Sequence, residues 1–100
     1  MLKDFFLGFI KIHILYHASR GPIYGVELLE ELGRHGYRLS PGTLYPTLHL
    51  LAREGYLSVE SKVIDGKVRK YYAITEQGLA ALDEARKKIA ELVDEVLQDK

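Results

Sequence analysis

The dipeptide Asp65-Gly66 restricts the fold of this chain more than any other feature, because it marks a tight hairpin turn. Runs rich in β-forming residues lie on both sides of it. Pairing outward from the turn sets Val63 opposite Val68 and Leu57 opposite Ile74. One face of the hairpin then carries Leu57, Val59, Val63, Val68, Tyr72 and Ile74, and the other carries Lys62, Arg69 and Tyr71. The sequence therefore predicts a two-stranded hairpin with one apolar face.

Two helices are predicted before the middle of the chain. Residues 2–19 are apolar on more than one face, so this helix has to be covered on most sides. The run Ser19–Pro22 ends it. Residues 23–34 carry leucines at helical spacing, and Gly33 and Gly36 mark the end of this second helix.

A third helix is predicted over residues 41–54, where the chain has its clearest helix start. Ser40 suits the N-cap position and Pro41 the first helical position. The helical period turns three leucines inward, which are Leu44, Leu48 and Leu51. Gly42, Pro46, His49 and Arg53 then lie on the opposite face, with Thr43, Tyr45 and Thr47 on the flanks.

A long last helix is predicted over about residues 76–98, with Thr75 as its N-cap. Its apolar stripe lasts about three heptads and comprises Leu79, Leu82, Ala85, Ile89, Leu92, Val93, Val96 and Leu97. Each large apolar side chain left in water forgoes about 1.5–3 kcal/mol, whereas a whole domain is stable by only about 5–15 kcal/mol. A second copy of the chain is the simplest cover. The expected dimer interface is Phe5, Phe6, Phe9, Leu79, Leu82, Ile89, Leu92, Val93 and Val96.

The order of three helices, a hairpin and a long helix is typical of a winged helix-turn-helix. We therefore expect a mainly α fold with a two-stranded β-hairpin wing (α+β). Residues 1–75 form its DNA-binding domain, and residues 76–100 form a dimerisation helix that the helix at 2–19 assists. In this architecture the third helix enters the major groove and the wing reaches the flanking backbone. A two-fold dimer would bind a pseudo-palindromic site in double-stranded DNA.

The candidate DNA-contacting residues lie on the third helix and on the hairpin. They are Ser40, Gly42, Thr43, Tyr45, His49, Arg53, Lys62, Lys67, Arg69 and Lys70. Each group has a plainer interpretation. Ser40 can act only as a helix cap, and Tyr45 can be half-buried. The charged residues of the hairpin can be solvent-exposed groups that prevent other strands from pairing with its edges.

Charge and composition narrow the function classes. The net charge is zero, but residues 1–75 hold ten Lys and Arg against seven Asp and Glu, and residues 76–100 hold four against seven. The body is therefore mildly basic and the tail acidic, which permits a local phosphate-binding face. There is no cysteine and no run of about 20 apolar residues, so we expect a cytoplasmic protein that no membrane segment anchors.

Neither catalysis nor a cofactor is predicted, because no nucleophile–base constellation and no phosphate-binding glycine loop is present. His13 and His17 have the spacing of two metal ligands on a helix. His35 and His49 lie elsewhere in the sequence, so no third ligand is evident. We therefore expect packing or interface roles for the pair and predict no metal site.

With these residues in view, the sequence resembles the PadR family of transcriptional regulators over nearly its whole length. The resemblance rests on the runs Ile23–Leu28, Ser40–Leu48, Gly55–Leu57 and Arg69–Thr75. It implies a dimeric winged-helix regulator of the short branch, often a repressor, that dimerises through the last helix and the first.

The resemblance also bears on a ligand. Some relatives bind flat aromatic compounds between protomers with an aromatic side chain of the last helix, but no aromatic residue follows Tyr72 here. Phe5, Phe6 and Phe9 can instead line a pocket for a small apolar or aromatic effector. Two alternatives to a DNA-binding repressor stay open: a winged-helix module that binds another protein, and a small-molecule-binding protein without DNA contact.

Overall fold

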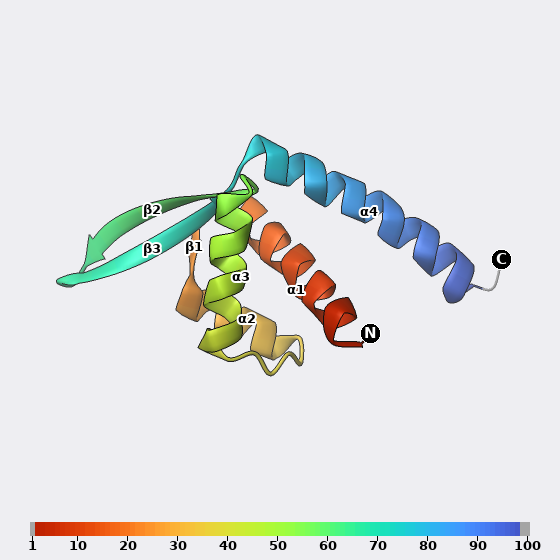
Figure 1. Cartoon of the computed structure of the whole chain (residues 1–100), viewed down its shortest axis with the longest axis horizontal. Coiled ribbons are helices and arrows are strands. Elements are labelled where there is room, and N and C mark those ends of the chain that lie inside the picture. The colour runs from red at the N-terminus through yellow and green to blue at the C-terminus, as the bar shows by residue number, and fades with distance from the viewer. Residues whose placement is uncertain (1, 99–100) are drawn as a thin grey trace.

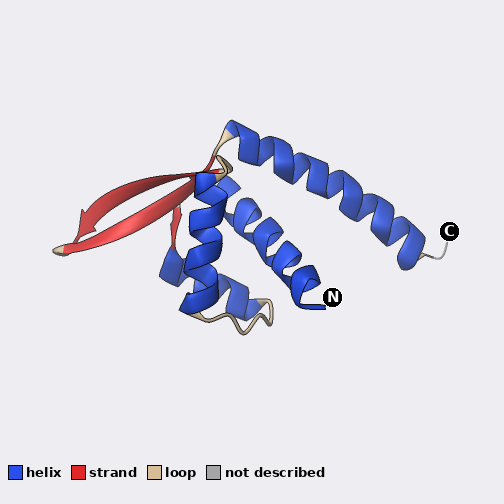
Figure 2. Cartoon of the chain, in the orientation of Figure 1, coloured by secondary structure: helices blue, strands red, loops and turns tan. Residues whose placement is uncertain are grey.

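The computed structural model describes residues 2–98, which form four helices and three strands (Figures 1 and 2). In chain order they are α1 (Leu2–Ser19), β1 (Ile23–Tyr24), α2 (Gly25–Arg34), α3 (Pro41–Arg53), β2 (Leu57–Ile64), β3 (Lys67–Ile74) and α4 (Glu76–Val96). The molecule is 55 Å long, and the β2–β3 wing and the far half of α4 project at opposite ends of the helical body (Figure 1). The α+β architecture with a hairpin wing is confirmed.

The register of the wing agrees with the prediction. β2 and β3 are antiparallel, with Val63 opposite Val68 and Leu57 opposite Ile74. Asp65 and Gly66 have φ angles of 51° and 76°, as a type I′ turn requires at both central positions. Only the base of the apolar face is buried, since Val63 and Val68 near the turn are about 70% and 69% exposed. The outer half of the wing therefore extends into solvent.

The start of the second helix was predicted two residues too early. Ile23 and Tyr24 form a short strand that pairs with Tyr72 and Tyr71 of β3, so the sheet has three strands in the order β1-β3-β2. A β-branched and an aromatic residue favour strand over helix. The free edge of β3 supplies the hydrogen-bonding groups that such a pair of residues needs, and α2 begins only at Gly25.

The core lies where the three N-terminal helices meet the base of the sheet and the start of α4. Its most buried side chains are Ile14, Leu28, Leu32, Leu44, Leu48, Tyr72 and Leu82. Two positions of α4, Gly78 and Leu82, are buried, so its first two turns belong to the body of the domain. Within residues 2–98, none of the helices is long and apolar enough to cross a membrane.

Thr75 joins α4 to the end of α3 through a pair of hydrogen bonds. Its hydroxyl accepts from the Gly78 N–H at 3.0 Å, as predicted for the N-cap, and donates to the Gly55 carbonyl at 2.6 Å. Gln77 adds a second link, because its amide donates to the Glu54 carbonyl at 3.2 Å. These bonds fix the direction in which α4 leaves the domain.

Replacing Thr75 with valine should lower the free energy of unfolding by about 1 kcal/mol, the typical contribution of an N-cap. The substitution keeps the β-branched shape and removes both hydrogen bonds of the hydroxyl. Urea denaturation followed by circular dichroism measures the change. Thr75→Ser keeps the hydroxyl and should recover most of the loss; equal stability of the two variants would contradict the capping role.

Candidate nucleic-acid interface

The face of α3 opposite its buried leucines is open to solvent. Gly42, Pro46, His49 and Arg53 are all exposed, as the helical period predicted. Thr47 faces the core instead, where its hydroxyl donates to the Thr43 carbonyl at 2.8 Å. Pro46 cannot donate to the carbonyl of Gly42, so one backbone acceptor near the start of the helix is left without its helical bond. α3 thus presents a polar, accessible ridge along one side.

The N-terminus of α3 differs in one detail from the sequence prediction. Ser40 has the extended backbone of an N-cap residue, but its side chain makes no capping hydrogen bond. Its hydroxyl instead lies 3.4 Å from that of Thr43. The first turn therefore offers two neighbouring hydroxyl groups at a helix end that favours anions.

Tyr45 packs over the start of α2 and is half-buried. A Cβ placed on Gly25 would lie 2.5 Å from the phenol oxygen and 2.6 Å from Cε1 of the Tyr45 ring. Only glycine leaves room for the ring in this position. Tyr45 therefore both packs on the core and has part of its surface open, so the two interpretations made from the sequence are compatible.

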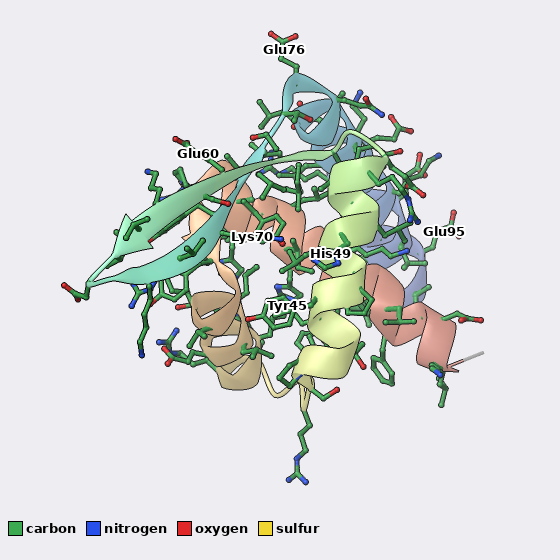
Figure 3. All side chains as sticks on the ribbon, turned by 60° about the vertical axis from the view of Figure 1, so that its left-hand side comes forward. Tyr45, His49, Glu60, Lys70, Glu76 and Glu95 are labelled. Atoms are coloured by element: carbon green, nitrogen blue, oxygen red, sulfur yellow. The ribbon has the colours of Figure 1, made fainter. Side chains whose placement is uncertain are left out.

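A hollow of about 500 Å³ lies between α3 and the wing. Its lining is Tyr24, Gly25, Val26, Tyr45, His49, Val68, Arg69, Lys70 and Tyr72. Figure 3 shows Tyr45, His49 and Lys70 around this space, two from the helix and one from the strand. Tyr24 and Val26 were not expected here, because the sequence pattern placed both inside a helix.

The wing divides its basic residues between two faces. Lys70 shares the face of Tyr72 and turns toward α3, whereas Lys62, Lys67 and Arg69 share the opposite face with Tyr71.

On that opposite face, the Lys62 ammonium lies 5.1 Å from the centre of the Tyr71 ring, and the Arg69 guanidinium lies 4.6 Å from that of Tyr24. These cation–π contacts hold the two long side chains in place.

The basic residues of the wing outnumber its two acidic residues, Glu60 and Asp65. Lys62 and Arg69 are directly opposite each other in the sheet, an arrangement of like charges that is unfavourable by itself. The ion pairs found among residues 2–98 lie on α2 and α4, and none includes a wing residue. A surface of this kind gains most from a partner that carries many negative charges.

The apolar stripe of α4 divides into a buried and an exposed part. Leu82 is only 2% exposed and belongs to the core of its own chain, so it leaves the set of residues expected at a dimer interface. Leu79, Leu92 and Val96 are 45%, 52% and 66% exposed. The other predicted interface residues of the helix, Ile89 and Val93, are partly exposed as well.

The middle of α4 lies next to α1, and the two helices splay apart toward the C-terminal end of α4 (Figure 1). Phe5 and Phe6 of α1 are about half exposed, and the Phe5 and Phe9 rings meet edge to face at 4.7 Å. Between the two helices lies a shallow hollow of about 240 Å³ whose lining includes Phe5, Phe9, Ile89 and Leu92. The apolar surfaces of α1 and α4 are therefore continuous.

Comparison of the sequence with known proteins identifies transcriptional regulators as its relatives. The model of the PadR-like family of transcriptional regulators matches residues 14–84. The transcriptional regulator Rv3488 of Mycobacterium tuberculosis is 48% identical over 96 residues, which cover 96% of this chain and 90% of that protein.

Solved structures of regulators from the same family have a similar fold. A PadR family regulator from Eggerthella lenta has a TM-score of 0.84 and 33% identity, over 98% of this chain and 87% of its own. A PadR-like regulator from Bacillus cereus has a TM-score of 0.77 and 34% identity, over 91% and 93%. The fold is thus shared with solved regulators of this family. The chain belongs to the PadR-like family of transcriptional regulators and is a DNA-binding regulator.

Proposed function

We propose that this chain acts in the cytoplasm as a homodimeric repressor that binds a pseudo-palindromic operator in double-stranded DNA. The observation that carries the proposal is the hollow between α3 and the wing, where Tyr45, His49 and Lys70 face one open space. An α-helix fits the major groove of B-DNA. With α3 in that groove, the wing lies over the adjoining sugar–phosphate backbone.

In this proposal the contacts to DNA fall into two kinds, those to phosphates and those to base edges. Ser40 and Thr43 offer hydroxyls at the start of α3, where Gly42 lets the backbone approach a phosphate closely. His49 is exposed in the middle of the helix and reaches base edges, and Tyr45 contributes its open edge.

The remaining candidates, Arg53, Lys62, Lys67, Arg69 and Lys70, bind phosphates. Phosphate contacts position the protein and base contacts select the sequence.

The homodimer is supported by the continuous apolar surface of α1 and α4. Two copies related by a two-fold axis would cover this surface and present two α3 helices to DNA. A DNA-binding unit that pairs through this surface would repress transcription by occupying a promoter. The small apolar effector stays a prediction; it would have to change operator affinity to regulate the protein.

Lys70→Ala should weaken DNA binding by a similar factor for all sequences and reduce the steepness of log K against log salt by about 2. The reason is that one phosphate contact is lost per half-site, which makes two contacts, and about two released counterions, for the dimer. The operator is first obtained by selection from a genomic DNA pool. Fluorescence anisotropy at several salt concentrations then measures the slope.

The matched control is Lys87→Ala, which removes the same charge from an exposed position of α4. Its slope should equal that of the unchanged protein, whereas His49→Ala should relax the choice of sequence at one base position. The proposal is wrong if the unchanged protein selects no sequence and binds no DNA even at low salt.

A further inference from the structure

Three of the four histidines meet beside α1, although His35 is distant from His13 and His17 in the sequence. His13 and His17 lie one turn apart on α1, and His35 is the C-cap residue of α2. One ring nitrogen from each lies within 4.8 Å of the other two. The ring of His13 stacks on that of His35, with centroids 4.9 Å apart. The C-terminal end of α2 packs near α1 and places the His35 imidazole next to those of His13 and His17.

One nitrogen of this cluster has no partner. Nε2 of His17 is buried and makes no hydrogen bond to any of the residues 2–98. A buried nitrogen with an unused donor or acceptor is destabilising, and native proteins rarely keep one without a reason. A bound ligand that accepts the lone pair of the imidazole would remove this penalty.

Two histidines of the cluster, His13 and His17, are shifted toward their neutral form. Burial lowers the pKa of His13, and the imidazoles of His35 and His17 lower it further. Burial is also the main cause that lowers the pKa of His17, opposed by Glu31 and assisted by His35 and Arg34. Neutral imidazoles with free lone pairs are the form that binds metals.

We propose that His13, His17 and His35 form a binding site for a divalent transition-metal ion, with Zn²⁺ as the representative. Imidazole nitrogens bind Zn²⁺ at about 2.0–2.1 Å, so tetrahedral ligands lie about 3.4 Å from one another. Small side-chain rotations close the present spacing of the three nitrogens. Three protein ligands leave the fourth position to water. Imidazole favours zinc, copper, nickel and cobalt over magnesium and calcium, which prefer oxygen ligands.

The surroundings are consistent with a site open on two sides. On one side, His17 borders a hollow of about 260 Å³ together with Glu31 and Arg34, which form an ion pair with each other. On the other, His13 and His35 border an apolar hollow of about 350 Å³ that Arg86 and Ile89 of α4 also line. The cluster thus lies between these two hollows. A bound ion would tie α1 to the end of α2.

The test uses the whole chain without a polyhistidine tag. Titration with Co²⁺, followed by visible absorption, should show the intense bands of a tetrahedral site and saturate at about one ion per chain. Zn²⁺ should displace Co²⁺ and raise the midpoint of thermal unfolding by several degrees, because it binds only the folded chain. Calorimetric titration with Zn²⁺ gives the affinity.

His35→Gln is the decisive variant, because His35 is exposed and its replacement leaves the core intact. It should weaken Zn²⁺ binding at least about tenfold, no less than the loss of a supporting contact costs a metal site. His17→Gln should do the same if it folds. His49→Gln alters the fourth histidine, on α3, and should bind Zn²⁺ as the unchanged chain does. Equal affinity in the His35 and His49 variants, or no tetrahedral Co²⁺ spectrum, would overturn the proposal.

Discussion

Leu92→Glu is expected to convert the protein from a dimer to a monomer and to weaken operator binding at least about 100-fold. Leu92 is 52% exposed on the apolar side of α4 and borders the hollow shared with α1. A carboxylate buried there against a second copy would lose its hydration, and Lys88, one turn before it, already pairs with Glu91. A monomer binds one half-site and loses the effective concentration that links the two, which is worth about 10²–10⁴ in affinity.

Light scattering coupled to size-exclusion chromatography measures the mass, and fluorescence anisotropy measures operator affinity. The control is Ala80→Glu, which adds the same charge to an exposed position on the opposite side of the helix. This variant should stay dimeric and bind the operator normally. If Leu92→Glu is dimeric and binds as tightly as the control, the interface lies elsewhere.

Gly78→Ala should lower the free energy of unfolding by about 1–3 kcal/mol, although alanine normally favours a helix over glycine by up to about 1 kcal/mol. A Cβ at this position would lie 2.2 Å from the Tyr56 carbonyl oxygen and 2.7 Å from Cγ1 of Ile74. The carbonyl is backbone and already accepts a hydrogen bond from the Thr75 N–H, so it cannot yield cheaply. α4 would have to tilt away from the base of the sheet.

Gly33→Ala is the matched control for this substitution, because Gly33 lies in α2 and a Cβ placed there would meet no neighbouring atom within 4 Å. It should be neutral or stabilise the protein by up to about 1 kcal/mol. Urea denaturation of the two variants should therefore give changes of opposite sign. Stabilisation by Gly78→Ala would show that α4 is not held against the Tyr56 carbonyl.

The wing and the Thr75 cap could be predicted from the sequence because their causes are local. Asp65 and Gly66 favour one turn type, and that turn fixes the register of all the pairs behind it. Thr75 caps the helix that follows it directly. Neither prediction depended on knowing which distant segments meet.

The features that sequence reasoning missed depend on contacts between distant segments. β1 exists because Ile23 and Tyr24 meet the edge of β3, almost fifty residues later. The sequence pattern gave Leu82 the same expected exposure as the other residues of the apolar stripe. In the structure it is buried, because the first turns of α4 pack on the core. His35 joined His13 and His17 through the fold alone. Nothing in the sequence around Gly25 indicated that the Tyr45 ring packs against it. Nothing around Gly78 indicated that it lies against the Tyr56 carbonyl.

The exposed apolar stripe of α4 has a consequence for the lifetime of the chain in the cell. In the proposed assembly, an unpaired protomer would expose Leu92, Val96 and Leu97 at the far end of a projecting helix. Cellular proteases cut segments that open easily, and all residues from 86 to 98, at this end of the chain, are exposed to solvent. Dimerisation would bury it, so newly made protein would be turned over until its concentration allowed pairing. The abundance of the regulator would then respond steeply, rather than in proportion, to its rate of synthesis.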